Sequence, residues 1–370
     1  MGAFTVRAAM VAVVCAAALA GCGSSADVEG AGEPTVKFDP GEAAPPTPLS
    51  DEIIKAAKDE GALLIYTNGD EESMKPLVDG FETAFPGIKV SVISLGSAEV
   101  VQRYRTERAT GTPSAGVLIS TDGVAMRALT EDGKILDYED PNLVHLRDDA
   151  ELAPGVVALS MDPMIAMFNK ALLPVEKQPK SLAEFAEMAP SMKGKIGTTD
   201  ISNPVQLAAT SGYIDATGDK GWETLGKLGS NAGVESGNAA VTQKLLKGAY
   251  TAGFFLSGTL RPHITGDVAK VLNYTYFSDV AMVIPRGMGI TADAPAPNAA
   301  KLFVNYALSV KGQEAGCAGG FTPYRSGVKC EYALSAVRAD EESLKVAGWA
   351  SDFSGKKKAT VSRWNAAFGR

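Results

Sequence analysis

The sequence predicts an α/β protein built as two lobes, and three observations support this prediction. The chain has 370 residues, which is more than one hydrophobic core usually spans. From Ser50 onward, short apolar strands alternate with amphipathic helices, as in a parallel sheet covered by helices. After Gly155 a second set of strands and helices begins. Hydrophobic residues make up 45% of the chain and charged residues 21%, so most of it has the composition of a folded globular protein.

The first set of elements repeats a strand followed by a helix three times. We expect strands at 62–66, 88–93 and 115–119, and helices at 72–85, 98–108 and 122–129. In the first helix, Met74, Leu77 and Phe81 recur at helical spacing, and Pro86-Gly87 ends the helix. This order predicts a parallel sheet with helices on both faces.

The second set opens with residues 156–168, an apolar and methionine-rich stretch that predicts a long strand. Ser181-Leu182-Ala183-Glu184 has the spacing of a capping box, so a helix is expected to begin there. Another strand is expected from Lys195 to Gly197. The two sets together predict two α/β lobes.

Residues 1–21 are expected to be a lipoprotein signal peptide. Arg7 is followed by an apolar run at 8–20, which is too short to span a bilayer. The run ends in Leu19-Ala20-Gly21-Cys22, which resembles the bacterial lipobox, so Cys22 is expected to carry the lipid, palmitate included. An ordinary cleaved signal with a chance cysteine is the alternative. Residues 22–48 are rich in Gly, Ala, Pro and Ser and predict a lipidated tether.

The four cysteines indicate one disulfide. Cys15 leaves with the signal peptide and Cys22 is expected to be lipidated, which leaves Cys317 and Cys330 to pair in an oxidising compartment. No metal-binding motif surrounds either cysteine, so we expect neither a metal site nor a cofactor.

Charge and histidine content argue against two classes of function. The 35 Lys and Arg residues against 43 Asp and Glu residues give a net charge of −8, which is unlike a nucleic-acid binder. The two histidines, His145 and His263, lie in no nucleophile, zinc or phosphate-loop motif. We therefore expect no enzyme, with a carboxylate-dependent hydrolase as the alternative.

Several segments in order carry a resemblance to a known family. They are residues 64–81, Phe85-Pro86-Gly87-Ile88-Lys89-Val90, Phe168-Asn169-Lys170, residues 192–197, residues 247–250, residues 298–309 and Gly312-Gln313. Together they resemble the extracellular solute-binding proteins whose founding members bind ferric iron. The resemblance implies a two-lobed type II periplasmic-binding-protein fold with a hinged inter-lobe cleft. It also implies a protein that binds a small-molecule solute and delivers it to ABC permease subunits in the membrane. We expect the protein to be a monomer.

The expected location is the cell envelope, with the lipid on the outer face of the cytoplasmic membrane, or the periplasm. A sensor that presents its solute to a membrane kinase is an alternative that the sequence does not separate from a transport receptor. We expect lobe one to comprise 49–158 and 284–325, and lobe two 159–283 and 326–370, with Trp349 and Trp364 packed on lobe two.

Small polar residues follow the strands of both lobes. Ligands of open α/β sheets bind beyond the carboxyl ends of the strands, where helix N-termini present free N–H groups. The ligand-binding candidates are Asn68, Asp70, Ser97, Thr121, Asp200, Ser202, Ser236, Gly237, Ser257 and Thr259. Each of them is also a common residue at a helix N-cap, so capping alone is the alternative role.

The resemblance places the metal ligands of ferric-binding relatives at Asp70, at Thr121, and at Gly258 with Thr259. A pair of tyrosines is missing from the last two positions, and glycine and a hydroxyl cannot replace two phenolates for ferric iron. We therefore expect a small anionic or zwitterionic organic solute: a phosphonate, a phosphate ester or a carboxylate.

A ferric-iron receptor is the alternative, through Tyr274 and Tyr276, which we expect instead to pack on one face of a strand. Arg261, Arg286 and Arg325 would suit an anion clamp, but a surface role is an equal expectation for each.

Overall fold

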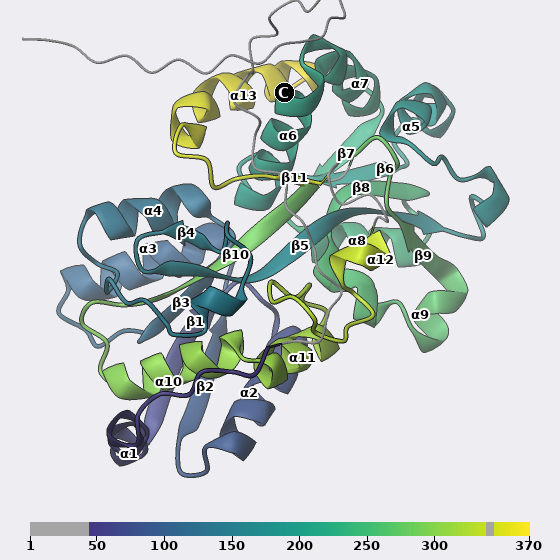
Figure 1. The fold of residues 1–370 in the computed structure, drawn as a ribbon. Coiled ribbons are helices and arrows are strands. Elements are labelled where there is room, and N and C mark those ends of the chain that lie inside the picture. The colour runs from purple at the N-terminus through teal and green to yellow at the C-terminus, as the bar shows by residue number, and fades with distance from the viewer. Residues whose placement is uncertain (1–43, 281, 338–343) are drawn as a thin grey trace, which may run out of the picture. The chain divides into compact units, whose positions relative to one another are not determined.

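The computed structural model describes residues 44–280, 282–337 and 344–370, all within one compact unit, Val36–Arg370. Figure 1 shows its helices and strands. The strands are β1 Ala62–Thr67, β2 Lys89–Ser94, β3 Val117–Ser120, β4 Glu151–Ala153, β5 Val156–Asn169, β6 Ile196–Thr199, β7 Ala232–Glu235, β8 Ala252–Ser257, β9 Leu272–Thr275, β10 Met282–Ile290 and β11 Lys345–Val346. The α-helices are α1 Asp51–Glu60, α2 Glu71–Ala84, α3 Ser97–Ala109, α4 Gly123–Glu131, α5 Leu182–Met188, α6 Pro204–Thr217, α7 Asp219–Gly229, α8 Asn238–Leu246, α9 Gly266–Val271, α10 Pro297–Leu308, α11 Val310–Ala318, α12 Leu334–Val337 and α13 Phe353–Ala367. Short 3₁₀ helices are η1 Leu143–His145, η2 Val175–Lys177, η3 Ala189–Met192 and η4 Gly258–His263.

Two long strands join two groups of parallel strands. The strand order is β2-β1-β3-β10-β5-β8-β6-β7. Strands β1, β2 and β3 are parallel and form lobe one, and β6, β7 and β8 are parallel and form lobe two. Strands β5 and β10 run antiparallel to each other, and β10 also pairs with β3 while β5 also pairs with β8 (Figure 1). Both lobes are therefore built on the same two crossing strands.

The predicted elements lie where the sequence places them. Strands β1, β2 and β3 and helices α2, α3 and α4 follow the predicted order. The predicted long strand is β5, and all of its residues are buried. Ser181 caps α5 as expected, since its side chain accepts a hydrogen bond from Glu184 N at 3.0 Å. Local hydrophobic spacing was thus sufficient to locate these elements.

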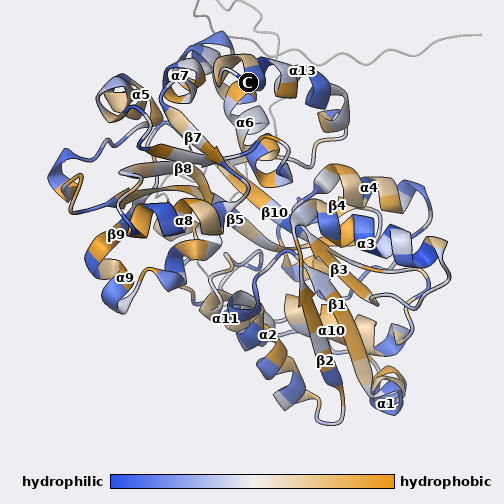
Figure 2. Cartoon of the chain, turned by 180° about the vertical axis from the view of Figure 1, so that it is seen from behind, coloured by the Kyte–Doolittle hydropathy of each residue, from blue (hydrophilic) through white to orange (hydrophobic). Residues whose placement is uncertain are grey.

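Separate hydrophobic clusters fill the two lobes. Phe81 contacts both Phe303 and Tyr306 in lobe one. Phe185 contacts both Phe168 and Phe254 in lobe two. Figure 2 shows the hydrophobic colour concentrated along the strands, which the helices cover.

One predicted tryptophan contact is correct and the other is wrong. Trp364, in α13, is fully buried in the lobe-two cluster, as expected. Trp349 belongs to the lobe-one cluster instead, and its indole N–H donates to Pro285 O in β10 at 2.8 Å. Ala347, in the same segment between β11 and α13, belongs to the lobe-two cluster, so this segment contacts both lobes. The exact lobe boundaries remain a prediction.

The end of the predicted tether is bound to lobe one. Thr47 N donates to Asn142 Oδ1 at 2.9 Å, and Thr47 O accepts from the side-chain amide of Asn305 at 3.0 Å. The Arg325 guanidinium donates to Ala44 O at 2.6 Å. Arg325 is only 1% exposed, so the surface role considered for it is wrong. Residues 44–47, at the end of the predicted tether, therefore contact lobe one.

The predicted disulfide is present. Cys317 and Cys330 are bonded, with 5.8 Å between their Cα atoms, and they close a loop that contains Arg325. The predicted signal peptide and Cys22 lie outside the described residues. Among the residues that the structure describes, no helix is both long and apolar enough to cross a membrane.

Candidate functional site between the two lobes

Three of the predicted ligand-binding residues meet at the carboxyl edge of lobe one. Asn68 follows β1, Ser97 begins α3 after β2, and Thr121 follows β3. The Asn68 side-chain amide donates to Ser97 Oγ and to Thr121 Oγ1, both at 2.8 Å. The two hydroxyl oxygens are 2.9 Å apart. The three side chains form one hydrogen-bonded cluster because the ends of parallel strands meet at one sheet edge.

A buried ion pair from the crossing strands supports this cluster. Arg286 in β10 and Asp162 in β5 are 3% and 2% exposed, and their closest N···O distance is 3.1 Å. Arg286 Nη1 also donates to Asn68 Oδ1. The surface role considered for Arg286 is therefore wrong. No local sequence signal identified the pair, because its partners are 124 residues apart.

A small pocket lies where the two lobes face each other. Thr121 and Asp122 line it from lobe one, Ser202 and Pro204 from lobe two, and Lys357 from α13. The remaining lining residues are Gly123, Val124, Leu207 and Phe353. Two predicted site residues, Thr121 and Ser202, thus share one pocket, while the contribution of α13 was not predicted.

Two helix N-termini border this pocket. Helix α4 begins at Gly123 and α6 at Pro204, and both positions line the pocket. A helix N-terminus carries partial positive charge, which favours an anion. Gly123 also allows close approach of the C-terminal segment, since a Cβ there would lie 2.2 Å from Gly348 O.

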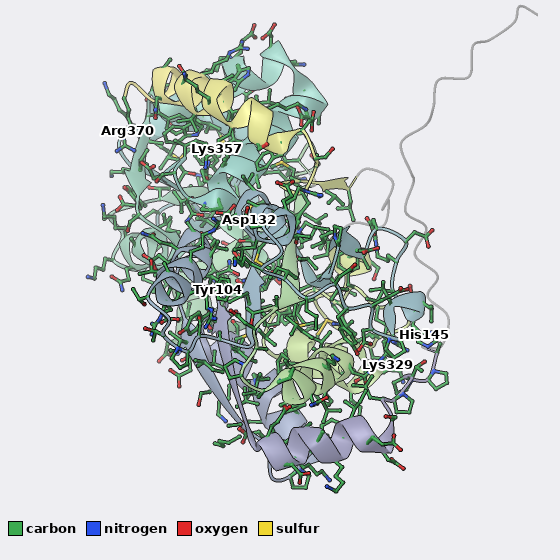
Figure 3. The ribbon with its side chains drawn as sticks, turned by 90° about the vertical axis from the view of Figure 1, so that its left-hand side faces the viewer. Tyr104, Asp132, His145, Lys329, Lys357 and Arg370 are labelled. Carbon is green, nitrogen blue, oxygen red and sulfur yellow. A yellow bond between two sulfur atoms is a disulfide. The ribbon has the colours of Figure 1, made fainter. Side chains whose placement is uncertain are left out.

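The pocket holds charged groups of both signs. Burial raises the pKa of Asp122, although its hydrogen bond from Ala125 N and the charge of Lys357 act in the opposite direction. Figure 3 shows Lys357 on the C-terminal helix. A pocket with one carboxyl, one ammonium and hydroxyl donors can bind an anion and can also pair an ammonium of a zwitterion.

Asp70 acts as a helix cap. Its side chain accepts from Ser73 N at 2.8 Å at the start of α2. His263 of η4, in lobe two, approaches it, with 3.9 Å between Nε2 and the carboxylate, and lies 3.1 Å from Glu72. Asp70 therefore lies beside a contact between the lobes, and no contact of its side chain joins it to the Asn68 cluster among the described residues.

Ser257 and Thr259 lie at the start of η4 with buried side chains. Their hydroxyl oxygens are 2.9 Å apart. The neighbouring Arg261 is 2% exposed, so the surface role considered for it is wrong. Its guanidinium donates to Thr322 Oγ1 at 2.7 Å and to Tyr276 Oη at 2.9 Å. Arg261 therefore holds η4 against the segment after α11 and is not free to clamp an anion.

The remaining candidates lie at the edge of lobe two. Asp200 accepts from Ser202 N at 2.9 Å and pairs with Arg370 at the C-terminus, which Figure 3 labels. The exposed Ser236 side chain makes no hydrogen bond within the part of the chain that the structure describes, and Gly237 precedes α8 as its N-cap. None of these residues except Ser202 lines the pocket between the lobes.

The two tyrosines considered for iron pack against each other. The rings of Tyr274 and Tyr276 are 5.9 Å apart, and both lie against the cluster around Leu272. Across the described ranges, no group of three or more His, Cys, Asp or Glu residues is arranged to hold a metal ion.

A second pocket lies within lobe one, away from the predicted site residues. Asp137, Asp140 and Glu151 line it together with apolar residues of β5 and β10, Val156 and Met288 among them. None of the predicted ligand-binding residues contributes to it.

Comparison with known proteins decides the family. Residues 76–342 match the model of the bacterial extracellular solute-binding protein family. The chain belongs to this family. No curated protein sequence is similar enough to the chain to count as a match.

Solved structures of other binding proteins, one of them from an ABC transporter, share the fold of this solute-binding protein. A substrate-binding protein from Agrobacterium tumefaciens is 20% identical, with a TM-score of 0.73 over 83% of this chain and 94% of that one. Iron-bound HitA from Pseudomonas aeruginosa is 17% identical, with a TM-score of 0.67 over 83% and 99%. AfuA from Actinobacillus pleuropneumoniae, with fructose-6-phosphate bound, is 20% identical, with a TM-score of 0.65 over 84% and 99%. The predicted type II periplasmic-binding-protein fold, with two lobes, is thereby confirmed.

Proposed function

We propose that this solute-binding protein is the substrate-binding lipoprotein of an ABC importer and captures a small anionic or zwitterionic organic solute between its lobes. The observation that carries the proposal is the pocket lined by Thr121, Asp122, Ser202 and Lys357. It takes residues from both lobes, so a solute bound there would hold the lobes together. That coupling is what a binding protein with a hinged cleft requires.

The chemistry of the pocket favours negatively charged oxygen. The Lys357 ammonium, two helix N-termini and the hydroxyls of Thr121 and Ser202 are all donors or positive groups. Asp122 adds one carboxyl, which suits the ammonium of a zwitterion. A phosphonate, a phosphate ester or a carboxylate with a short amino substituent matches this set.

The similarity to known binding proteins supports a solute-binding role. Two of these proteins hold ligands of different chemistry, an organic phosphate and a metal ion. AfuA carries a sugar phosphate and HitA carries iron on the same fold. In this chain, the positions that follow β8 are Gly258 and Thr259, which supply no phenolate. Tyr276 already accepts a hydrogen bond from Arg261, so its oxygen faces a cation of the protein. These features favour the organic anion over ferric iron.

A thermal-shift screen tests this proposal. The lipid-free protein is heated with inorganic phosphate, methylphosphonate, glycerol 3-phosphate, succinate, glutamate or ferric citrate. A ligand at about a hundred times its Kd should stabilise the protein by about 2.7 kcal/mol, a clear rise in Tm. We expect an anionic or zwitterionic compound to give that rise. A rise with ferric citrate alone, with a visible tyrosine–iron absorption band, would contradict the proposal.

A matched pair of variants on α13 locates the binding. Lys357→Met removes a pocket cation, whereas Lys358→Met removes the neighbouring exposed lysine, which does not line the pocket. We expect the first to reduce the thermal shift strongly and the second to leave it in place. Equal effects of the two variants would place the solute elsewhere.

The lipid anchor is proposed from the sequence motif at Cys22. Anchoring by acyl chains on the outer face of the cytoplasmic membrane would keep the binding protein near its permease. Mass spectrometry of the membrane-extracted protein should find the diacylglycerol on an N-terminal Cys22. An unmodified N-terminus at another residue would overturn this part of the proposal.

A further inference from the structure

The side chain of Asn68 lies between one cation and two hydroxyl groups, and this fixes the direction of its amide. Its Oδ1 accepts from Arg286, and its Nδ2 donates to the hydroxyls of Ser97 and Thr121, each at 2.8 Å. A guanidinium has only donors, so the amide oxygen must face Arg286 and the NH₂ group must face the hydroxyls. In the reversed amide, the NH₂ group of Asn68 would face the guanidinium of Arg286, and both groups can only donate.

Arg286 is itself held in place. Asp162 Oδ2 accepts from Arg286 Nε at 3.2 Å and from Nη2 at 3.1 Å. The guanidinium also lies over the ring of Phe321, 5.1 Å from its centroid. Ser160 Oγ donates to Asp162 at 3.0 Å, which fixes the carboxylate in turn. Because Arg286 and Asp162 come from the two crossing strands, the direction of the Asn68 amide depends on the framework that joins the lobes.

The hydroxyl protons of Ser97 and Thr121 determine whether the Asn68 cluster can donate a hydrogen bond to a ligand. Ser97 Oγ and Thr121 Oγ1 both accept from Asn68 and are 2.9 Å apart, so only one of them can donate to the other. One hydroxyl proton is therefore left without an acceptor among the described residues. Thr121, and not Ser97, lines the pocket between the lobes. When Ser97 donates to Thr121, the unused proton is that of Thr121 and is available to a solute in that pocket.

We propose that Arg286 is a positioning residue for solute binding, because it orients Asn68 so that Thr121 donates a hydrogen bond to an acceptor oxygen of the solute. The identity of the solute class rests on the proposed function, whereas the amide orientation does not. With the amide reversed, both hydroxyls would donate to Asn68 and would offer the pocket only lone pairs. Arg286 therefore determines whether this edge selects the oxygen of a phosphate, phosphonate or carboxylate or instead selects a donor group.

The orientation is tested without any ligand by nuclear magnetic resonance of the Asn68 side-chain NH₂, identified by its absence in Asn68→Asp. We expect two distinct, slowly exchanging protons in the wild type and in Arg286→Lys, which keeps a donor toward Asn68. In Arg286→Gln, the glutamine can present either its amide oxygen or its NH₂ group to Asn68. The Asn68 amide then has no fixed direction, so its NH₂ protons should lose their protection from exchange. If Arg286→Gln fails to fold, the double variant Asp162→Asn/Arg286→Gln removes both buried charges and carries the same prediction. Protection that persists without Arg286, or its absence in the wild type, overturns the proposal.

The consequence for binding is measured with inorganic phosphate as the probe, by calorimetry. Thr121→Val should weaken phosphate binding by at least about tenfold, since it removes a hydrogen bond to a charged group. Thr121→Ser keeps the hydroxyl and should bind within a few-fold of the wild type. Arg286→Gln should lose affinity as Thr121→Val does, whereas Arg286→Lys should keep most of it. Equal affinities of Thr121→Val and Thr121→Ser overturn the role of this donor. A wild type that binds no anion, with the amide protection intact, counts instead against the proposed function.

Discussion

Asp122 caps α4 and also lines the pocket between the lobes. Burial raises its pKa, so the folded protein holds this proton to a higher pH than the unfolded chain, in which an aspartate titrates near about 3.9. The folded state therefore binds more protons than the unfolded state in that window. Stability from this group is present at low pH and is lost as the pH rises through the raised pKa. At neutral pH the charged carboxylate thus reduces stability, which fits a role in binding.

We expect Asp122→Asn to stabilise the ligand-free protein at pH 7, because the amide caps a helix as well as the carboxylate does and carries no charge to bury. The gain should vanish below about pH 3, where the aspartate is protonated in both states. Urea unfolding across this pH range measures it. Asp122→Ala is the control, since it loses the cap and about 1 kcal/mol. A pH-independent difference between Asp122→Asn and the wild type would contradict this account.

At the scale of residues, the sequence predicted part of the site for a simple physical reason. Asn68 and Thr121 directly follow parallel strands, and Ser97 begins the helix after a third, so a shared sheet edge brings them together. Arg286 and Asp162 carry no such local signal. Their pairing depends on which strands cross between the lobes, and this is decided by contacts far apart in the sequence.

Among the elements, the segment before α1 is the one whose role differs most from expectation. Its composition predicts a tether that buries no core, yet residues 44–47 accept hydrogen bonds from Arg325 and Asn305 in lobe one. The signal was missed because the hydrogen bonds involve the backbone of the segment, and composition does not report backbone partners.

We expect a chain that begins at Leu49 to be less stable than one that begins at Ala44. The shorter chain leaves the buried Arg325 without the carbonyls of Ala44 and Pro45, and a hydrogen bond to a charged group contributes about 1.5–3 kcal/mol. Urea unfolding of the two chains side by side measures the difference. Identical midpoints and slopes would show that the contact contributes no stability.

The disulfide stabilises the same region. Cys317 and Cys330 are 13 positions apart, and a loop of this size is expected to contribute about 3 kcal/mol. The double variant Cys317→Ala/Cys330→Ala should unfold at a correspondingly lower urea concentration. Reducing agent should lower the stability of the wild type and leave the variant unaffected. Equal stabilities of the wild type and the double variant, with no effect of reducing agent on the wild type, would contradict this contribution.

The sequence predicted a C-terminal tail at the position of helix α13 and did not predict a helix there. Its buried Trp364 packs in lobe two as predicted, while Phe353 and Lys357 reach the pocket. The helix packs against α6 and α7, and Phe353 and Lys357 share a pocket with Pro204 at the N-terminus of α6. The hydrophobic spacing of a surface helix indicates which side is buried, but it does not indicate which cleft the helix end borders.

For the whole molecule, the two-lobed fold followed from the sequence because each lobe repeats an alternation of strands and helices that forms a local pattern. The crossing strands β5 and β10 join the lobes, and the solute is proposed to bind beside them. The central claim is that residues of both lobes and of α13 hold one solute together.

Hydrogen–deuterium exchange with the anion that gives the largest thermal shift tests this claim most directly. We predict slower exchange, on binding, in three separate segments: the starts of α4, α6 and α13, near Thr121, Ser202 and Lys357. Peptides lining the second pocket, near Asp137 and Glu151, should exchange unchanged and serve as the internal control. Protection confined to one lobe, or protection of the second pocket instead, would contradict a solute site between the lobes.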